Sequence, residues 1–236
     1  MKKAFTITNI ILILAILIGD VFYMLPPNFL WEKSITSTGF VILGISNLIY
    51  ALKSGNNKKF CITMVVGLLF GLLGDVLLEI NFIVGAAFFG IGHVIYILAY
   101  CFLSKLRWMD LIVSACIAIP SVLVITLVPA FNFNGIVMEL VCVFYAIVIS
   151  FMVGKSVSNL IKKRTLLNTL LVVGSILFFF SDLMLLLANF ANMPLVVSIL
   201  CLATYYPGQC ILAHSIMHTQ NSEHSDEVSA LRGEKQ

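Results

Sequence analysis

Two aspartates interrupt otherwise apolar stretches of the chain, and their surroundings are alike. Asp75 lies in GLLGDVLLE and Asp182 lies in FFFSDL, and a glycine precedes each of them by eight residues, at Gly67 and Gly174. A carboxyl group among apolar side chains favours its protonated form and can deliver a proton, while a second, ionised carboxyl can orient water or stabilise a cation. The two aspartates are therefore the first candidates for acid–base chemistry.

Several other polar side chains interrupt apolar stretches and could support such a pair. His93 and Tyr96 lie three residues apart in GHVIY, so they share one face of a helix. Pro207 and Gly208 interrupt a later stretch, where the proline removes a helical hydrogen-bond donor. The other candidates are Tyr145, Tyr205, Tyr206 and Gln209. For the histidine, the tyrosines and the proline turn, satisfied packing inside a helical bundle is an equally good interpretation.

The composition shows which kind of element must position these side chains. Of the 236 residues, 61% are hydrophobic and 11% are charged, and the mean hydropathy is +1.08. An ordinary soluble domain is roughly 45–50% apolar and about 25% charged. These values exclude a soluble domain, a disordered chain, a nucleic-acid-binding protein and a disulfide-stapled scaffold. The six cysteines form no CxxC pair, and no metal or cofactor site is expected.

Eight apolar stretches are long enough to cross a bilayer, which takes about 20 residues of helix. The predicted class is an all-α, polytopic membrane helical bundle with eight transmembrane helices in one domain, residues 1–217. The expected spans are Ala4–Leu25, Ile35–Leu52, Phe60–Ile80, Phe82–Leu103, Trp108–Val128, Ile136–Val157, Leu166–Ala188 and Leu195–Met217.

The basic residues predict the orientation of these spans. With the N-terminus inside, thirteen of the fourteen Lys and Arg residues, Lys155 among them, fall in inner loops and tails, and only Lys33 falls outside. This asymmetry predicts a multi-pass protein of the cell membrane with both termini in the cytoplasm. The polar residues 218–236 are expected to form a disordered cytoplasmic tail.

Asp75 and Asp182 are expected at similar depth, in helices that run from inside to outside. Asp75 lies 16 residues beyond Lys59 and Asp182 lies 18 beyond Arg164, roughly 24 to 27 Å along each helix. The two carboxyls could therefore face each other. Together with the glycine spacing, this suggests a parallel four-plus-four repeat.

Four further acidic residues fall near the outer helix ends: Asp20, Glu32, Glu79 and Glu139. For Glu32, Glu139 and the neighbouring Lys33, position alone favours a side chain that snorkels to the membrane interface. Asp20 is less easily explained in this way, because it lies inside the first apolar stretch.

The stretch GLLFGLLGDVLLEINFIVGAAFFGIGHVIYILAY, residues 67–100, resembles the GD and GHxxY block of the YhhN family of membrane proteins. Ser181-Asp182, the YYxGQ run at residues 205–209, the eight-span length and Lys33 resemble the same family. One departure is Ser34, which follows Lys33 where the family has proline.

This resemblance implies a lysoplasmalogenase-like hydrolase. Such an enzyme cleaves the vinyl ether bond of a lysoplasmalogen to a fatty aldehyde and a glycerophospho-ethanolamine or -choline. Its substrate partner is then a lysophospholipid of the bilayer. Asp75 and Asp182 match the acidic motifs of the family and are the expected catalytic pair, working without a metal. The other candidates are expected to hydrogen-bond the carboxyls or the glycerol, and Lys33 to meet the phosphate.

Three other functions fit parts of the same pattern. A proton-coupled transporter also uses buried carboxylates and a histidine. A lipid-binding membrane protein would need neither aspartate. An intramembrane aspartyl protease is disfavoured, because the usual GxGD is Leu72-Leu73-Gly74-Asp75 here and no Tyr-Asp partner occurs.

Overall fold

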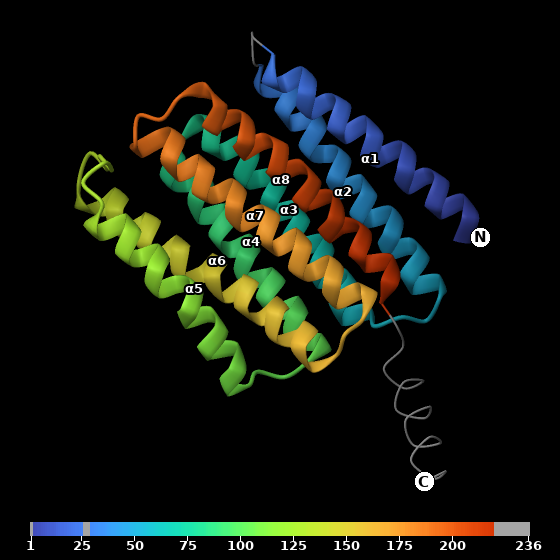
Figure 1. Ribbon diagram of the computed structural model, residues 1–236. Helices are drawn as coiled ribbons and strands as arrows, with labels where there is room; N and C mark the ends of the chain where they lie inside the picture. Colours follow the sequence, from blue (N-terminus) through green and yellow to red (C-terminus); the bar gives the residue numbers. More distant parts are fainter. Residues whose placement is uncertain (1, 26–28, 220–236) are drawn as a thin grey trace.

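The predicted bundle of eight helices is confirmed. A computed structural model describes residues 2–25 and 29–219, and these residues form eight long helices and one short 3-10 turn (Figure 1). The helices are α1 (Lys2–Met24), α2 (Leu30–Lys53), α3 (Lys58–Ile80), α4 (Phe82–Leu103), α5 (Trp108–Leu127), α6 (Ile136–Lys162), α7 (Leu166–Phe190) and α8 (Leu195–Ser215), and η1 (Ile216–His218) follows α8 directly. The predicted tail lies outside the described residues from 220 onward.

Two helices, α2 and α6, extend five residues beyond the predicted spans, and the added residues carry polar side chains with hydrogen-bond partners. α2 begins at Leu30 rather than Ile35, and Glu32 in its first turn accepts a hydrogen bond from the backbone N–H of Phe29, just before the helix. α6 continues to Lys162 rather than Val157. Its last turns carry buried polar residues that bond to neighbouring helices.

The bundle is apolar on its outer faces and polar at many positions inside. All eight helices are long and apolar enough to cross a membrane. Large aliphatic side chains such as Ile11, Ile112 and Leu195 are exposed, whereas Asn47, His93 and Gln209 are fully buried. Outward apolar and inward polar residues are the arrangement expected of helices packed within a lipid bilayer.

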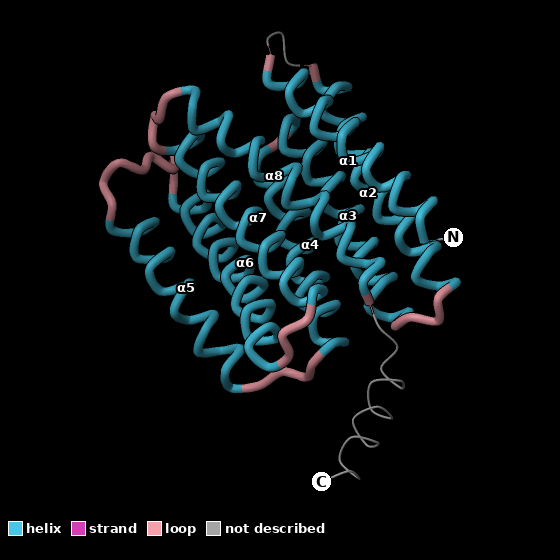
Figure 2. Tube along the Cα trace, turned by 45° about the vertical axis from the view of Figure 1, so that its right-hand side comes forward, coloured by secondary structure: helices cyan, strands magenta, loops and turns pink. Residues whose placement is uncertain are grey.

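The helix packing agrees with the predicted parallel four-plus-four repeat only in part, because α1 and α3 pack on α8, whereas over their described lengths α5 and α7 do not pack on α4. Neighbouring helices pair as α1–α2, α3–α4, α5–α6 and α7–α8. In addition, α2 packs on α3, and α6 packs on α7. Between the halves, α4 packs on α6 and α8 packs on α2, which are equivalent contacts (Figures 1 and 2). Among the described helices α5 packs only on α6, at one edge of the bundle. Over their described lengths α3 and α7 make no direct backbone contact.

The glycines of the sequence echo make equivalent close approaches in the two halves. A Cβ atom at Gly92 of α4 would lie 3.5 Å from the carbonyl oxygen of Gly67 of α3. In the other half, a Cβ atom at Gly208 of α8 would lie 3.3 Å from the carbonyl oxygen of Gly174 of α7. Small residues thus let the third and fourth helices of each half approach closely, as is common in membrane bundles. α8 also continues without a break through Pro207.

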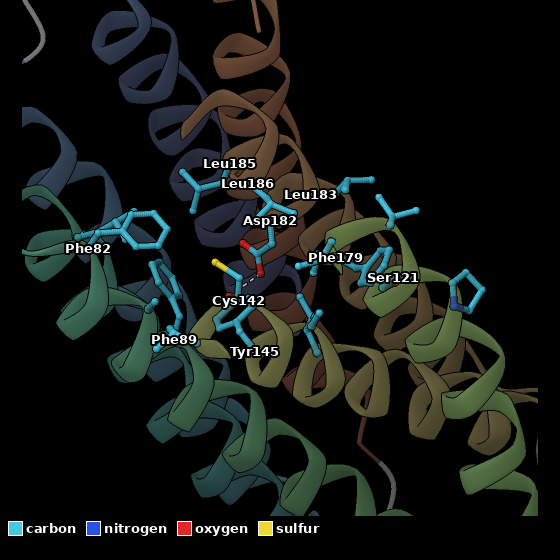
Figure 3. A pocket seen from close by; sticks show the side chains of 18 residues that line it. Phe82, Phe89, Ser121, Cys142, Tyr145, Phe179, Asp182, Leu183, Leu185 and Leu186 are labelled. Carbon is cyan, nitrogen blue, oxygen red and sulfur yellow. Dashed lines mark hydrogen bonds between the residues drawn. The ribbon is translucent and has the colours of Figure 1, made fainter. Parts of the chain in front are cut away.

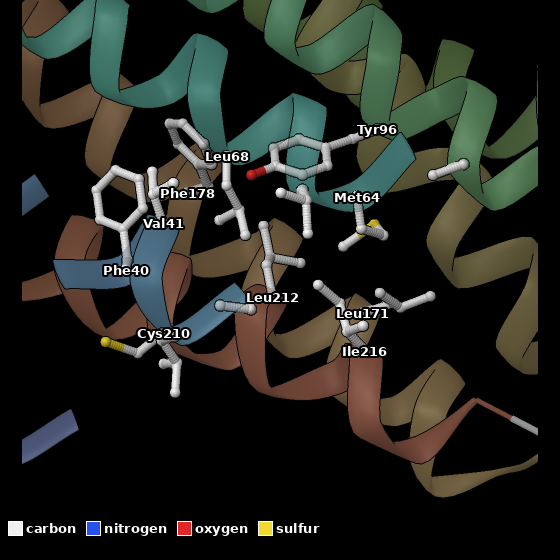
Figure 4. Close-up of a cluster of buried hydrophobic side chains, with 14 of the residues drawn as sticks. Phe40, Val41, Met64, Leu68, Tyr96, Leu171, Phe178, Cys210, Leu212 and Ile216 are labelled. Atoms are coloured by element: carbon white, nitrogen blue, oxygen red, sulfur yellow. The ribbon is translucent and has the colours of Figure 1, made fainter. Parts of the chain in front are cut away.

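The main hydrophobic core fills the space between α2, α3, α7 and α8. Phe40, Leu68 and Leu212 are fully buried there, and Tyr96 of α4 reaches into the same cluster (Figure 4). This core is continuous with the polar clusters described next, because the rings of Phe178 and Tyr205 belong to it. Tight packing on both sides restricts where the polar side chains can point.

Two ends of the bundle are distinguished below by their charges. The end that carries the loops after α2, α4 and α6 contains Lys53, Lys58, Lys59, Lys105, Arg107, Lys162, Lys163 and Arg164 and is called the basic end. The end that carries the loops before α2, α4, α6 and α8 is called the opposite end.

Candidate active site

Asp75 is held by hydroxyl groups from two helices of the bundle. It lies near the end of α3 and is 3% exposed. The hydroxyls of Ser37 in α2 and Tyr205 in α8 donate to its Oδ2 atom at 2.6 and 2.7 Å. Because the single proton of Ser37 points to Asp75, the Tyr206 hydroxyl must donate to the Ser37 Oγ, at 3.1 Å. The Oδ1 atom of Asp75 accepts no hydrogen bond from the described residues.

Tyr205 is oriented in turn by a chain of hydrogen bonds from α4. The amide nitrogen of Gln209 donates to the Tyr205 hydroxyl at 3.3 Å, and the amide oxygen of Gln209 accepts from the Tyr96 hydroxyl at 3.0 Å. Gly71 leaves the room for this amide, because a Cβ atom there would lie 2.8 Å from the Gln209 nitrogen. In this series of hydrogen bonds, Tyr96 donates to Gln209, Gln209 donates to Tyr205, and Tyr205 donates to Asp75.

Asp182 is held by a tyrosine and a histidine. The hydroxyl of Tyr145 in α6 donates to the Asp182 Oδ2 at 2.6 Å (Figure 3). The Nε2 atom of His93 in α4 lies 2.7 Å from that hydroxyl and 3.3 Å from the same carboxylate oxygen. Since Tyr145 donates to Asp182, the Nε2–H of His93 is the donor to Tyr145. The Nδ1 atom of His93 is buried and has no hydrogen-bond partner among the described residues.

Each carboxyl is held by equivalent helices of the two halves. Asp75 of α3 is bonded by α2 of its own half and by α8 of the other half. Asp182 of α7 is bonded by α6 of its own half and by α4 of the other half. Each cluster leaves one carboxyl oxygen without a hydrogen bond from the described residues, so each carboxyl keeps one oxygen for a reacting group.

Aromatic rings connect the two clusters. The Phe178 ring lies 5.2 Å from the Tyr205 ring and 4.7 Å from the His93 ring, and Phe89 packs edge-on against both Phe178 and Tyr205. A chain of contacts thus runs from Asp75 to Asp182. No hydrogen bond joins the two carboxyls within the described part of the chain. The predicted pair therefore forms two clusters connected through rings rather than two carboxyls in contact.

An apolar cavity of about 250 Å³ adjoins the Asp182 cluster (Figure 3). Its walls come mainly from α4, α5, α6 and α7, with Phe82, Phe89, Cys142 and Leu186 among the lining residues. Asp182 and Tyr145 also line the cavity, with the carboxyl and the hydroxyl that form the 2.6 Å hydrogen bond. Asp75 does not line this cavity. A mostly apolar hollow with a few convergent polar groups is the usual form of a small-molecule site.

Lys33 lies one helical turn before Ser37 in α2, beside the Asp75 cluster on the side of the opposite end, and close enough for its charge to interact with that of Asp75. Its Nζ atom is 2.7 Å from the Glu79 Oε1, and the Tyr23 hydroxyl donates to the same oxygen at 3.2 Å. Lys33 is only 6% exposed, whereas the Glu79 side chain is 41% exposed. The expectation of a snorkelling lysine outside the helices is therefore wrong. Lys33 belongs to the first turns of α2, and its charge is neutralised by a partner that the sequence pattern did not identify.

Two buried acidic residues lie outside the predicted candidate set. Asp20 of α1 is 3% exposed, and its Oδ1 atom has no hydrogen-bond partner in the described residues. At the start of α5, Asp110 forms a fully buried ion pair with Lys155 of α6, at 2.8 Å. Lys155 also donates to the carbonyl oxygen of Lys105. The assignment of Lys155 to an inner loop was wrong, because α6 is long enough to bury it.

The structure brings all but one of the predicted site residues into the two clusters. Lys33 makes no hydrogen bond to either cluster within the described residues but lies beside the Asp75 cluster, and the catalytic roles of all these residues stay predictions. Within residues 2–25 and 29–219, no group of three or more His, Cys, Asp or Glu residues is arranged to hold a metal ion.

Comparison with known proteins identifies the family. The model of the YhhN family matches residues 36–216, which is most of the chain, and the protein belongs to this family. The matched range contains both carboxyl clusters and begins after Asp20 and Lys33. No curated protein and no solved structure matches the chain.

Proposed function

We propose that this YhhN-family membrane protein is a lysoplasmalogenase-like hydrolase, which cleaves the vinyl ether bond of a lysoplasmalogen. The observation that carries the proposal is the pair of carboxyls inside the bundle, each with one oxygen held by hydrogen bonds: Asp75 is buried, and Asp182, whose side chain is 10% exposed, lies beside an apolar cavity. The resemblance noted above supplies the reaction and the substrate class. The two carboxyl clusters supply groups of the kind that this reaction needs.

Hydrolysis of a vinyl ether is limited by delivery of a proton to carbon. Protonation of the vinyl carbon that is not bonded to oxygen produces an oxocarbenium ion, water adds to the carbon bonded to oxygen, and the resulting hemiacetal collapses to an aldehyde and an alcohol. The reaction needs an acid, a base for the water, and stabilisation of the cation. Paired carboxylates perform the same tasks in glycoside hydrolysis.

Under this proposal Asp182 is the acid and Asp75 is the base. Asp182 lines the apolar cavity, where an alkenyl chain can lie, so it is placed to give a proton to the vinyl carbon. Asp75 does not line that cavity, and its Oδ2 atom is held by two hydroxyl donors, so it takes the role of the base toward water. The rings of Phe89, Phe178 and Tyr205 connect the two carboxyls, and aromatic faces stabilise a neighbouring cation.

The proton balance closes over the two halves of the reaction. Asp182 gives its proton to the vinyl carbon, and Asp75 takes a proton from the attacking water. When the hemiacetal collapses, Asp75 returns its proton to the departing glycerol oxygen and Asp182 takes the proton of the hemiacetal hydroxyl. The sum is one vinyl ether and one water converted to one aldehyde and one alcohol, with both carboxyls restored.

Lys33 is proposed to meet the phosphate of the lysolipid. It lies toward the opposite end, where its partner Glu79 is accessible and can be displaced. The asymmetry of the basic residues leads us to propose further that the basic end is cytoplasmic and that the protein resides in the cell membrane. The substrate would then come from the outer leaflet.

The experiment is measurement of aldehyde release from lysoplasmalogen by purified protein in detergent. Asp75→Asn and Asp182→Asn should each lower turnover by about 10²-fold or more, the usual contribution of a general acid or base. Glu139→Gln, a carboxyl at the start of α6 outside both clusters, is the matched control and should keep wild-type turnover. Full turnover in either aspartate variant would remove that residue from the mechanism.

A proton-coupled transporter is the second candidate function, favoured by one observation. His93 Nε2 lies within hydrogen-bonding distance of Tyr145 and beside Asp182, an arrangement that suits proton relay within a membrane. Transport predicts pH-driven flux in proteoliposomes with no covalent change of the lipid. The hydrolase predicts aldehyde in detergent without any gradient. A lipid-binding protein would give neither signal and would tolerate neutralising both aspartates.

A further inference from the structure

A second hollow opens on the outside of the bundle between α4 and α6. It has a volume of about 570 Å³, and its lining includes Ala86, Gly90 and Val94 of α4 and Val137, Val141 and Tyr145 of α6. None of the residues that line this groove is charged. We call it the α4–α6 groove.

The α4–α6 groove shares a wall with the cavity beside Asp182. Ala86, Val141 and Tyr145 line both hollows. The Tyr145 ring therefore separates the outer groove from the inner cavity, and its hydroxyl donates to Asp182. A group that lies in the groove against Tyr145 is one side chain away from the carboxyl.

Gly90 keeps the groove open over the Tyr145 ring. A Cβ atom at Gly90 would meet only one atom within 4 Å, the Cδ2 of Tyr145 at 3.8 Å, which is an ordinary contact distance. Most other helical glycines of the chain are filled closely by a neighbouring side chain or backbone. The space at Gly90 is thus available to a ligand rather than occupied by the protein.

The groove faces the place where lipid chains lie. Val94, Val137 and Phe144 are 52%, 63% and 69% exposed, and all three are inside spans of membrane-crossing length. From Ile83 to Val94 the groove follows twelve residues of α4, about 16 Å. Its lining is apolar and carries no charged side chain, so it suits a hydrocarbon chain rather than a head group.

We propose that the α4–α6 groove is the lateral entrance of the site and binds the hydrocarbon chain of the lysolipid as it comes from the bilayer. This inference rests on the proposed function for the identity of the lipid. It adds the path by which a single-chain lipid reaches Asp182, and it makes Tyr145 the residue that the chain must pass.

The test uses a lysolipid with a photoreactive group on its chain. Cross-linking to purified protein, followed by mass spectrometry of peptides, should place the label on α4 and α6 near Gly90 and Tyr145. Gly90→Leu should lower this labelling by about tenfold, since filling an apolar site by even one methylene has effects of that order. Val94→Trp fills the groove from an exposed position and serves as the second variant.

Ala203→Leu is the matched control. Ala203 is exposed on α8, eight residues after the start of that helix, as Gly90 is eight residues after the start of α4. Ala203→Leu adds the same side chain at the same depth, but on α8 rather than in the α4–α6 groove, and it should leave labelling unchanged. Where the wild-type protein releases aldehyde, Gly90→Leu should also raise the KM for the lysolipid, whereas Ala203→Leu should leave that KM unchanged.

The outcomes separate the two proposals. Labelling that avoids α4 and α6, or that is equal in wild type and Gly90→Leu, overturns the groove assignment. Cross-links between two copies of the chain through Gly90 would show a helix interface instead and overturn it as well. Groove labelling that depends on Gly90, in protein that releases no aldehyde, would support the chain site while refuting the hydrolase.

Discussion

Removal of one hydroxyl group should separate catalysis from stability at the Asp182 cluster. In Tyr145→Phe the ring stays, with its 5.2 Å contact to the His93 ring, but the 2.6 Å hydrogen bond to Asp182 is lost. Under the proposed function Asp182 becomes a carboxylate as it gives up its proton, and a hydrogen bond to a charged group contributes about 1.5–3 kcal/mol. If the bond positions Asp182 in the transition state, turnover should fall by about 10- to 150-fold. Binding of the lysolipid should change much less.

Tyr100→Phe is the matched control for that experiment. The Tyr100 hydroxyl is also buried and bonds the Ser175 hydroxyl at 2.9 Å, but it touches neither carboxyl. Both variants should lose similar thermal stability in detergent, while only Tyr145→Phe should lose turnover, measured as aldehyde released per minute at saturating lipid. Equal turnover losses in the two variants, or wild-type turnover in Tyr145→Phe, would refute the reasoning.

Three further predictions concern other parts of the molecule. Lys155→Met should destabilise the fold by about 3 kcal/mol, because it removes the closest cation from the buried Asp110 and leaves only Arg107, 3.8 Å away; adding Asp110→Leu should recover most of the loss in a detergent unfolding assay. Gly71→Ala should displace the Gln209 amide and lower turnover about fivefold, because the loss of one hydrogen bond costs about 1 kcal/mol. Unchanged turnover would show that the hydrogen bonds from Tyr96 through Gln209 to Tyr205 do not position the Asp75 carboxyl. A single labelling cysteine at Asn56, in a chain freed of its own cysteines, should react with impermeant reagents only after the membrane is opened, and reaction in intact cells would reverse the proposed orientation.

Much of the scaffold could be predicted because it depends on local composition. The length and hydropathy of each apolar stretch determine the spans, and seven of the eight helices begin within two residues of the predicted position. The two glycines that precede Asp75 and Asp182 by eight residues both lie at close helix contacts, while the four-plus-four repeat that their spacing suggested stays a prediction. Patterns of this kind need no knowledge of distant partners.

The missed features all depend on partners from distant parts of the chain. Lys33 is buried because Glu79, 46 residues later, neutralises it, and Lys155 is buried because Asp110, 45 residues earlier, does the same. Single-sequence patterns give each charge a position along its own helix but not the helix that faces it. For that reason a paired lysine looked like an interfacial one, and the fully buried Lys155 looked like a loop charge.

The two halves of the bundle explain how two like carboxyls can perform different tasks. Helices equivalent in the two halves hold Asp75 and Asp182, so a symmetric scaffold alone would give two carboxyls of the same character. The halves differ in the side chains they place there: a serine and a tyrosine around Asp75, a tyrosine and a histidine around Asp182. Asp182 borders the apolar cavity and Asp75 does not. An acid and a base require unlike surroundings, and under the proposed function these different side chains and the cavity would supply that difference.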